Sequence, residues 1–251
     1  MATVNKKLYG LIGFPLGHSF SQMFFNQKFE AENINAEYRN FEMPDIGDLM
    51  ELLSEYTLLE GLNVTRPYKE QVIPYMDEMD ETAAGVGAVN VIKFFREGDD
   101  FRLKGYNSDV KGFSDSLNPL ITPERKKALI LGTGGAAKAV AYALGKLRIE
   151  NRLVSRSARE GVLTYDELDP AIMSEHKIII NTTPLGMYPH VDECPAIPYS
   201  DLTPEHLCYD LIYNPDVTLF MHRAAEHGAE TKNGLEMLML QAFESWDIWN
   251  K

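Results

Sequence analysis

Cysteine, tryptophan, positive charge and long apolar runs are all scarce in this sequence of 251 residues. Its two cysteines, Cys194 and Cys208, are too few for a disulfide framework, so we expect a reduced, cytoplasmic setting. No stretch approaches the roughly 18 apolar residues of a membrane-spanning helix. The apolar run at residues 8–14 is broken by glycine and precedes Pro15, which favours a buried strand over a signal peptide.

Basic residues are outnumbered by acidic ones, 24 against 37, which gives a net charge of −13. A surface of that sign repels phosphate backbones and anionic headgroups, so we expect neither nucleic acid nor membrane as a partner. The charge does not exclude a small anion in a local pocket. The six histidines show no metal-ligand spacing, so we expect no metal, and we interpret His18 as structural.

What the sequence does contain is an alternation of strand-like and helix-like segments, which predicts an α/β fold with mainly parallel sheets. Helices are expected at 21–32 and 45–53, and a hairpin is expected around the turn at 98–100. The boundary between two series of elements is expected near residue 110. The predicted strands are 7–12, 37–41, 59–64, 89–95, 101–106, 128–131, 152–155, 177–180 and 207–211.

The C-terminal segment has the clearest helical periodicity. Its apolar residues recur at the spacing of a single helical face, which predicts that this face is buried. The residues concerned are Leu235, Leu238, Met239, Ala242, Phe243, Trp246 and Trp249.

A glycine-rich turn follows the apolar run at 128–131 and precedes a helical run at 137–147. Its first glycine, Gly132, permits a tight turn, and Gly134 lets the backbone approach a pyrophosphate. The small residue Ala137 allows the helix to pack on the strand, and the helix N-terminus offers N–H groups to the anion. The pattern predicts a Rossmann-type dinucleotide site that includes Gly135 and Ala136.

The end of the next predicted strand indicates which dinucleotide is bound. An NAD site usually has an acidic residue there, about 20 residues beyond the glycines. This chain instead has Ser155, Arg156 and Ser157, with no acid before Glu160. A guanidinium flanked by hydroxyls binds a 2′-phosphate, whereas a carboxylate repels it, so we expect NADP(H).

Polar clusters also follow strands in the first half, where open α/β sheets place their ligands. They contain Ser19 and Ser21, the segment 63–69, the segment 87–90 and the segment 107–109. Together with the segments 181–187, 209–215 and 234–242 they resemble the motifs of shikimate dehydrogenase, in order and along almost the whole chain. Small departures are Ser108 for threonine, Val91 for threonine and Phe20 for leucine.

The resemblance implies a two-domain enzyme for the reversible, NADPH-dependent reduction of 3-dehydroshikimate to shikimate, in the pathway to chorismate and the aromatic amino acids. It implies a substrate domain at 1–110, completed by a returning C-terminal helix at 234–251, and a doubly wound NADP domain at 111–233. A monomer or a homodimer is expected.

Roles for individual residues also come from the resemblance. Lys69 and Asp109 are implied as the catalytic pair, which should converge beside the nicotinamide, and it stays open whether Lys69 donates the proton or stabilises charge. Substrate binding is implied for Ser19, Ser21, Thr65, Asn90, Tyr213 and Gln241. Cofactor binding is implied for Gly132, Gly134, Gly135, Ala136, Ser155, Arg156, Ser157, Thr182, Gly234 and Met237.

Three alternatives stay open at this point. Tyr142 and Lys146 have the spacing of the short-chain dehydrogenase pair, but they lie only ten residues beyond the glycine turn. A quinate/shikimate dehydrogenase of broader substrate or cofactor range shares the motifs. A non-catalytic NADP-binding protein would keep the glycine turn, but its expected signature is the loss of Lys69 or Asp109, and both are present.

Overall fold

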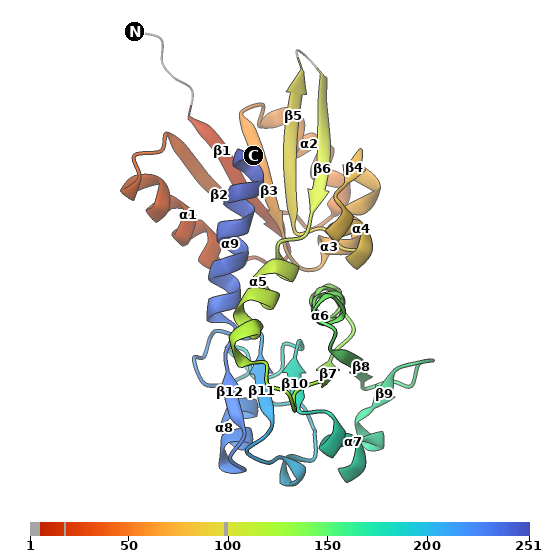
Figure 1. Ribbon diagram of the computed structural model, residues 1–251. Helices are drawn as coiled ribbons and strands as arrows, with labels where there is room; N and C mark the ends of the chain where they lie inside the picture. Colours follow the sequence, from red (N-terminus) through yellow and green to blue (C-terminus); the bar gives the residue numbers. More distant parts are fainter. Residues whose placement is uncertain (1–5, 18, 98–99) are drawn as a thin grey trace. The chain divides into compact units, whose positions relative to one another are not determined.

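The computed structural model of the chain describes residues 6–17, 19–97 and 100–251. Two interpretations made above, the turn at 98–100 and the structural role of His18, therefore fall wholly or partly outside the described residues. The chain forms two compact units (Figure 1). The first contains the described residues up to Ser108 together with Ala242–Lys251, and the second contains Asp109–Gln241. The domain boundaries expected from the sequence, at residues 110 and 234, stay predictions; residues 234–241 belong here to the second unit.

The sheet of the first unit has the strand order β2-β1-β3-β5-β6-β4. Strand β1 (Lys7–Gly13) pairs in parallel with β2 (Ala36–Glu42) and with β3 (Leu59–Val64). Strands β5 (Val91–Glu97) and β6 (Asp100–Tyr106) form an antiparallel hairpin, and the short β4 (Glu78–Met79) pairs in parallel with β6. The sheet is therefore mixed, as the hairpin requires.

The helices of the first unit are short, apart from α1 (Phe20–Ala31). They are α2 (Leu49–Glu55), α3 (Tyr68–Gln71) and α4 (Glu81–Val86), with single 3-10 turns at Ile46–Asp48 and Ile73–Tyr75. Alternate residues of β1 serve two cores because a strand points successive side chains to opposite faces. Leu8 and Ile12 join the cluster that includes α2, whereas Tyr9 and Leu11 join the cluster that includes α1.

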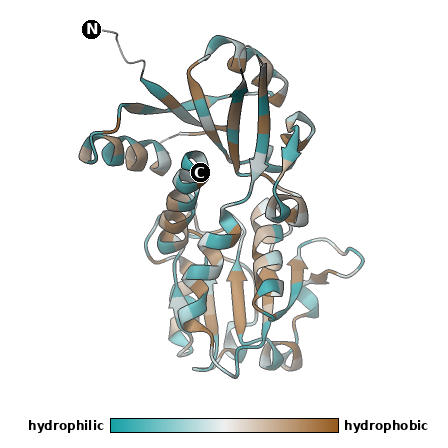
Figure 2. Cartoon of the chain, turned by 45° about the horizontal axis from the view of Figure 1, so that its top comes forward, coloured by the Kyte–Doolittle hydropathy of each residue, from teal (hydrophilic) through white to brown (hydrophobic). Residues whose placement is uncertain are grey.

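The second unit is the doubly wound parallel sheet that the sequence predicts. Its strands run in the order β12-β11-β10-β7-β8-β9, and every pair is parallel. The strands are β7 (Lys127–Leu131), β8 (Glu150–Ser155), β9 (Leu163–Thr164), β10 (Ile178–Asn181), β11 (Leu207–Asp210) and β12 (Glu230–Lys232). Figure 2 shows that the central strands are mainly hydrophobic, as expected of a sheet covered on both faces.

Five helices belong wholly or partly to the second unit. They are α5 (Asp109–Leu117), α6 (Gly135–Lys146), α7 (Pro170–Glu175), α8 (Leu219–Glu226) and α9 (Leu235–Asn250), with 3-10 turns at Asn118–Leu120, Tyr165–Glu167 and Tyr199–Asp201. The strand order reverses between β7 and β10, which is the switch point where open α/β sheets bind ligands.

Helix α9 corrects one expectation. Leu235, Met239 and Phe243 were expected in a buried stripe, but they are exposed by 39%, 39% and 43%. Ala242 and Trp249 of the predicted stripe are buried as expected, and Ser245 and Ile248, which the stripe did not include, are buried with them in the first unit. The buried face is therefore rotated toward Ser245, a polar residue that apolar periodicity does not count. No helix in the described part of the chain is long and apolar enough to cross a bilayer.

Candidate active site

The turn between β7 and α6 has the geometry that its glycines predict. Gly132 has φ +121°, and a Cβ added there would lie 2.5 Å from Thr182 Oγ1. The Thr182 side chain cannot easily move away from such a Cβ, because its backbone N–H and its hydroxyl both donate to the Leu131 carbonyl, at 3.0 and 2.7 Å. Ala137, which belongs to α6, is fully buried. The turn therefore holds Thr182, at the end of β10, against the first glycine.

The N-terminus of α6 fits a phosphate group. Gly134 is the N-cap residue and provides no side-chain cap, and a Cβ added there would meet nothing within 4 Å. Gly135 and Ala136 form the first turn, so their N–H groups point out of the helix without an intrahelical partner. Open space beside uncapped N–H groups at the switch point is what a pyrophosphate requires.

The segment after β8 supplies a positive charge at the neighbouring strand end. Ser155 Oγ accepts a hydrogen bond from the Ser157 N–H at 3.2 Å, which folds the segment into a tight turn. Arg156 is exposed, and within the described residues it makes no ion pair. An unneutralised guanidinium between two hydroxyls suits a 2′-phosphate.

The ends of β10 and β11 are joined by a buried polar network that the sequence did not reveal. Asp210 Oδ1 accepts from the Asn181 amide at 3.1 Å and from the Ile212 N–H at 3.0 Å, and Asp210 Oδ2 accepts from Thr218 at 2.6 Å. Asn181 in turn accepts from the Thr183 N–H and hydroxyl. Burial raises the pKa of Asp210 to about 6, although its hydrogen bonds lower it. The network ties the loop that contains Thr182 to the loop that leads to Tyr213.

Two close backbone contacts bring further predicted residues together within the second unit. Gly234 packs so closely on Leu211 that an added Cβ would lie 2.0 Å from its carbonyl oxygen. On α5, a Cβ at Gly112 would lie 2.8 Å from the Met237 carbonyl oxygen and 2.9 Å from Gln241 Cβ. The helix that begins at Asp109 therefore packs directly on the segment of α9 that contains Met237 and Gln241. Tyr213 lies two residues beyond Leu211 and is 37% exposed.

The serine motif of the first unit lies at the start of α1. Ser19 is the N-cap residue, and its hydroxyl accepts from the Gln22 N–H at 3.4 Å. Ser21 hydrogen-bonds to Tyr38, whose hydroxyl donates to Asn63 Oδ1 at 2.8 Å. The sequence points to Asn63 only as part of a motif and gives no signal for Tyr38, although both are buried.

Asn90, Thr65 and Lys69 also come together within the first unit. Asn90 is buried, and its side chain holds Ser108: Oδ1 accepts from the Ser108 N–H at 2.7 Å and Nδ2 donates to the Ser108 hydroxyl at 3.0 Å. The Val64 N–H, next to Thr65, donates to the Asn90 carbonyl at 2.9 Å, and the Lys69 carbonyl accepts from the Val89 N–H at 2.7 Å. The segment with Lys69 is thus fixed beside the segment with Asn90.

The predicted site residues are therefore divided between the two units. Lys69, Ser19, Ser21, Thr65 and Asn90 belong to the first unit; Asp109, Tyr213, Gln241 and all the predicted cofactor residues belong to the second. The convergence of Lys69 with Asp109 stays a prediction.

Two further expectations concern α6 and metal binding. Tyr142 and Lys146 both lie on α6, where the Lys146 ammonium sits 5.3 Å from the centre of the Tyr142 ring. Such a contact accounts for both side chains without a catalytic role. Among the described residues, no three His, Cys, Asp or Glu side chains are grouped as a metal site requires.

Comparison with known proteins gives consistent matches along the chain. A family model for the shikimate dehydrogenase substrate binding domain matches residues 11–92. The chain is 39% identical to an NADP(+) shikimate dehydrogenase of Carboxydothermus hydrogenoformans, covering 96% of this chain and 91% of that protein.

Solved structures extend the similarity to the fold. Shikimate 5-dehydrogenase of Thermus thermophilus, in complex with NADP(H) and shikimate, has a TM-score of 0.84 at 27% identity and covers 97% of this chain and 93% of its own. Quinate dehydrogenase of Corynebacterium glutamicum, in complex with NAD, has the same TM-score, identity and coverage. Both units are therefore within the similarity.

Proposed function

The chain belongs to the shikimate dehydrogenase family, and on that premise we propose that it catalyses the reversible, NADPH-dependent reduction of 3-dehydroshikimate to shikimate. The reaction belongs to the pathway to chorismate and the aromatic amino acids. The observation that carries the proposal is the uncapped α6 N-terminus at the switch point, combined with the exposed Arg156 at the next strand end. These two features suit a dinucleotide with a 2′-phosphate.

In this proposal the second unit holds the cofactor. Gly132, Gly134, Gly135 and Ala136 hold the pyrophosphate, and Arg156 holds the 2′-phosphate together with Ser155 and Ser157. Thr182, Gly234 and Met237 surround the nicotinamide. When bound, NADPH supplies the hydride that the reduction requires.

The first unit holds the substrate, in keeping with the family model that matches residues 11–92. Ser19 and Ser21 bind the carboxylate near Tyr213, and Thr65, Asn90, Asp109 and Gln241 bind the ring hydroxyls. Ser19 suits an anion because it caps the N-terminus of α1, where backbone N–H groups and the helix dipole favour negative charge.

Lys69 and Asp109 act at the carbonyl oxygen of the substrate. As carbon gains the hydride, the oxygen must gain a proton, and a positioned acid lowers that barrier. The Lys69 ammonium either delivers this proton or stabilises the charge that develops on the oxygen, and Asp109 accepts a hydrogen bond from the hydroxyl.

We further propose that the protein works in the cytoplasm, as a monomer or homodimer, without nucleic acid or membrane as a partner. Two free cysteines suit a reducing compartment. The net charge of −13 disfavours binding to polyanions.

The most direct test follows reduced nicotinamide by absorbance with purified protein, shikimate or quinate, and NADP or NAD. We expect turnover of shikimate with a clear preference for NADP. The similarity to a quinate dehydrogenase makes quinate the second candidate substrate. Absence of turnover with shikimate would refute the main proposal, and equal efficiency with NAD would refute the role of Arg156.

Replacing the proposed catalytic lysine tests the chemistry. Lys69→Ala should lower kcat for shikimate by about 10²–10⁴-fold because it removes the group that acts at the carbonyl oxygen. The dissociation constant for NADP should stay within about twofold, as measured by calorimetry.

A matched control is Lys177→Ala, which removes a lysine paired with Glu205 at 2.9 Å, at the opposite end of β10 from Asn181. Its turnover should equal that of the unmodified protein. A near-normal rate for Lys69→Ala would exclude Lys69 from the mechanism.

A further inference from the structure

A continuous chain of hydrogen-bonded side chains runs through the interior of the first unit. It passes from Ser21 on α1 to Tyr38 on β2, Asn63 on β3, Ser245 on α9 and Ser108 before α5, where Asn90 closes it; we call it the buried polar chain. We infer that Ser245 and Tyr38, which bear no assigned role, are positioning residues for the substrate site.

From Tyr38 onward, each side chain of the buried polar chain can donate a hydrogen bond to the next one. The Tyr38 hydroxyl donates to Asn63 Oδ1 at 2.8 Å, so the Asn63 amide nitrogen faces the other way. That nitrogen donates to Ser245 Oγ at 3.0 Å and to the Asn90 carbonyl at 3.3 Å. Ser245 therefore accepts from Asn63, and its own proton can point to Ser108 Oγ, 3.2 Å away.

Both ends of the buried polar chain reach residues with a proposed role. Ser21 is proposed to bind the carboxylate of the substrate. At the other end Ser108 directly precedes Asp109, and Asn90 holds both the hydroxyl and the backbone N–H of Ser108. The buried polar chain therefore positions both Ser21 and the backbone that leads to Asp109.

Burial makes each link costly to lose. Ser245 and Ser108 are fully buried, and Tyr38, Asn90 and Asn63 are exposed by only 1%, 3% and 6%. Water cannot easily replace a deleted hydroxyl there, so a neighbouring amide or hydroxyl would be left unsatisfied and would move to find a partner.

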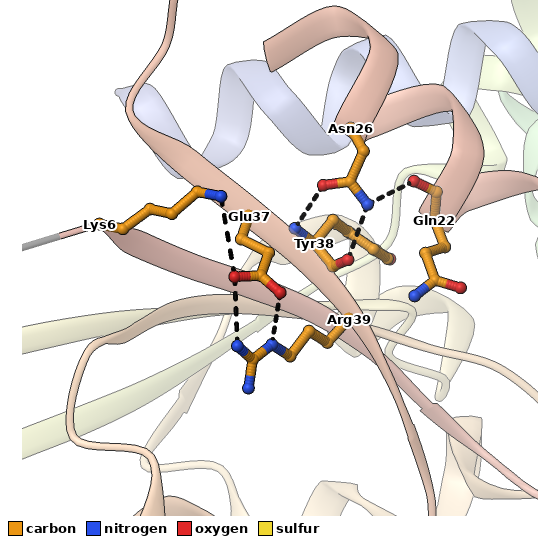
Figure 3. Close-up of polar contacts among 6 residues, drawn as sticks. All are labelled: Lys6, Gln22, Asn26, Glu37, Tyr38 and Arg39. Carbon is orange, nitrogen blue, oxygen red and sulfur yellow. Dashed lines mark hydrogen bonds and ion pairs between the residues drawn. The ribbon is translucent and has the colours of Figure 1, made fainter. Parts of the chain in front are cut away.

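The backbone of Tyr38 is held on both sides by one side chain of α1. The Asn26 side chain on α1 donates to the Tyr38 carbonyl at 2.9 Å and accepts from the Tyr38 N–H at 2.9 Å (Figure 3). The same Asn26 amide donates to the Gln22 carbonyl within α1. This clamp joins β2 to the helix that bears Ser21.

The role of the two residues at the substrate site rests on the proposed function, whereas their effect on the position of Ser108 does not, and two variants test both. Ser245→Ala and Tyr38→Phe each remove one hydroxyl without adding bulk. Each should lower kcat/KM for shikimate about tenfold, while KM for NADP stays within about twofold. Because the links act as a unit, the double variant should lose less than the product of the two single losses.

The matched control is Ser116→Ala. Ser116 is also a fully buried serine, and its hydroxyl lies 2.7 Å from the Tyr209 hydroxyl, outside the buried polar chain. The control should lower the thermal midpoint without changing KM for shikimate. Ser245→Thr, which keeps the hydroxyl, should recover most of the activity lost in Ser245→Ala.

A second measurement does not depend on turnover. Hydrogen exchange of the Ser108 amide, which donates to Asn90, should be faster in Ser245→Ala and in Tyr38→Phe than in Ser116→Ala. Unchanged exchange in both variants, or shikimate kinetics equal to those of the control, would overturn the inference. Absence of shikimate turnover in the unmodified protein would instead refute the proposed function, and the exchange experiment would still decide the inference.

Discussion

Asp210 is a buried carboxyl group whose partners, Asn181, Ile212 N–H and Thr218, are all neutral donors. Among the described residues no cation offsets the loss of solvation, so burial outweighs the hydrogen bonds and raises the pKa of Asp210 to about 6, above the ordinary value of 3.8. A group with a raised pKa stabilises the fold below its unfolded pKa, and this contribution is lost as the pH rises through the folded pKa.

Asp210→Asn should therefore change how stability depends on pH. Relative to the unmodified protein, the free energy of unfolding of the variant should improve by about 2 kcal/mol between pH 4.5 and pH 7.5, because the variant has no carboxyl group to ionise. Urea unfolding at the two pH values measures this difference. The exposed Asp192→Asn serves as a control, and an equal change in that variant would contradict the assignment to Asp210.

At the scale of elements, the turn from β7 to α6 contains two glycines, Gly132 and Gly134, whose surroundings constrain a side chain differently. Gly132 is required by the fold, because its φ of +121° and its contact with Thr182 leave no room for a side chain. Gly134 has φ −81° and open space around it, so the fold itself tolerates alanine there. The open space at Gly134 is available to a ligand, and a side chain there would enter that space.

The two alanine variants should therefore separate stability from cofactor binding. Gly132→Ala should lower the free energy of unfolding by about 1–3 kcal/mol. Gly134→Ala should change it by less than about 1 kcal/mol but should weaken NADP binding about tenfold or more, because the new methyl group occupies the space of the pyrophosphate. Thermal unfolding and calorimetric titration with NADP measure the two effects. Tight NADP binding by folded Gly134→Ala would contradict the assignment.

At the scale of the whole molecule, the two units differ in how the chain builds them. The second is one continuous segment, Asp109–Gln241, whereas the first needs Ala242–Lys251 from the far end of the chain. The Trp249 ring lies 4.8 Å from that of Tyr9 and 5.3 Å from that of Phe25, and its ring nitrogen donates to the Ile92 carbonyl at 3.0 Å. A Cβ at Gly61 would lie 2.3 Å from that nitrogen, so strand β3 fits closely around the tryptophan.

Truncation after Gln241 should therefore unfold the first unit and spare the second. Loss of a buried tryptophan alone costs about 3–5 kcal/mol, which is close to the whole stability of a small domain. Hydrogen exchange resolved along the chain should show loss of protection in β1 and β3 and retained protection in β7 and β10. Deletion of the exposed Lys251 alone should leave both patterns unchanged. Uniform loss of protection would contradict the independence of the second unit.

Several features could be predicted from the sequence because local pattern determines them. The longer strands, the parallel sheet of the second unit and the glycine turn after β7 all follow from periodicity and from residues a few positions apart, whereas the short strands β4, β9 and β12 were not predicted. The motifs also carried the family assignment, because they occur in order along the chain. Such signals need no knowledge of which distant segments meet.

The remaining features depend on contacts between distant parts of the chain. Ser245 meets Asn63 across 182 positions and Ser108 across 137, so no local pattern marks it as buried or as part of a site. Apolar periodicity predicted a buried stripe on α9 in which Ala242 and Trp249 are indeed buried, but packing leaves Leu235, Met239 and Phe243 exposed and buries Ser245. Asp210 acquired its raised pKa only when its neighbours excluded water. A sequence determines which groups are available, and burial decides which of them must be satisfied by one another.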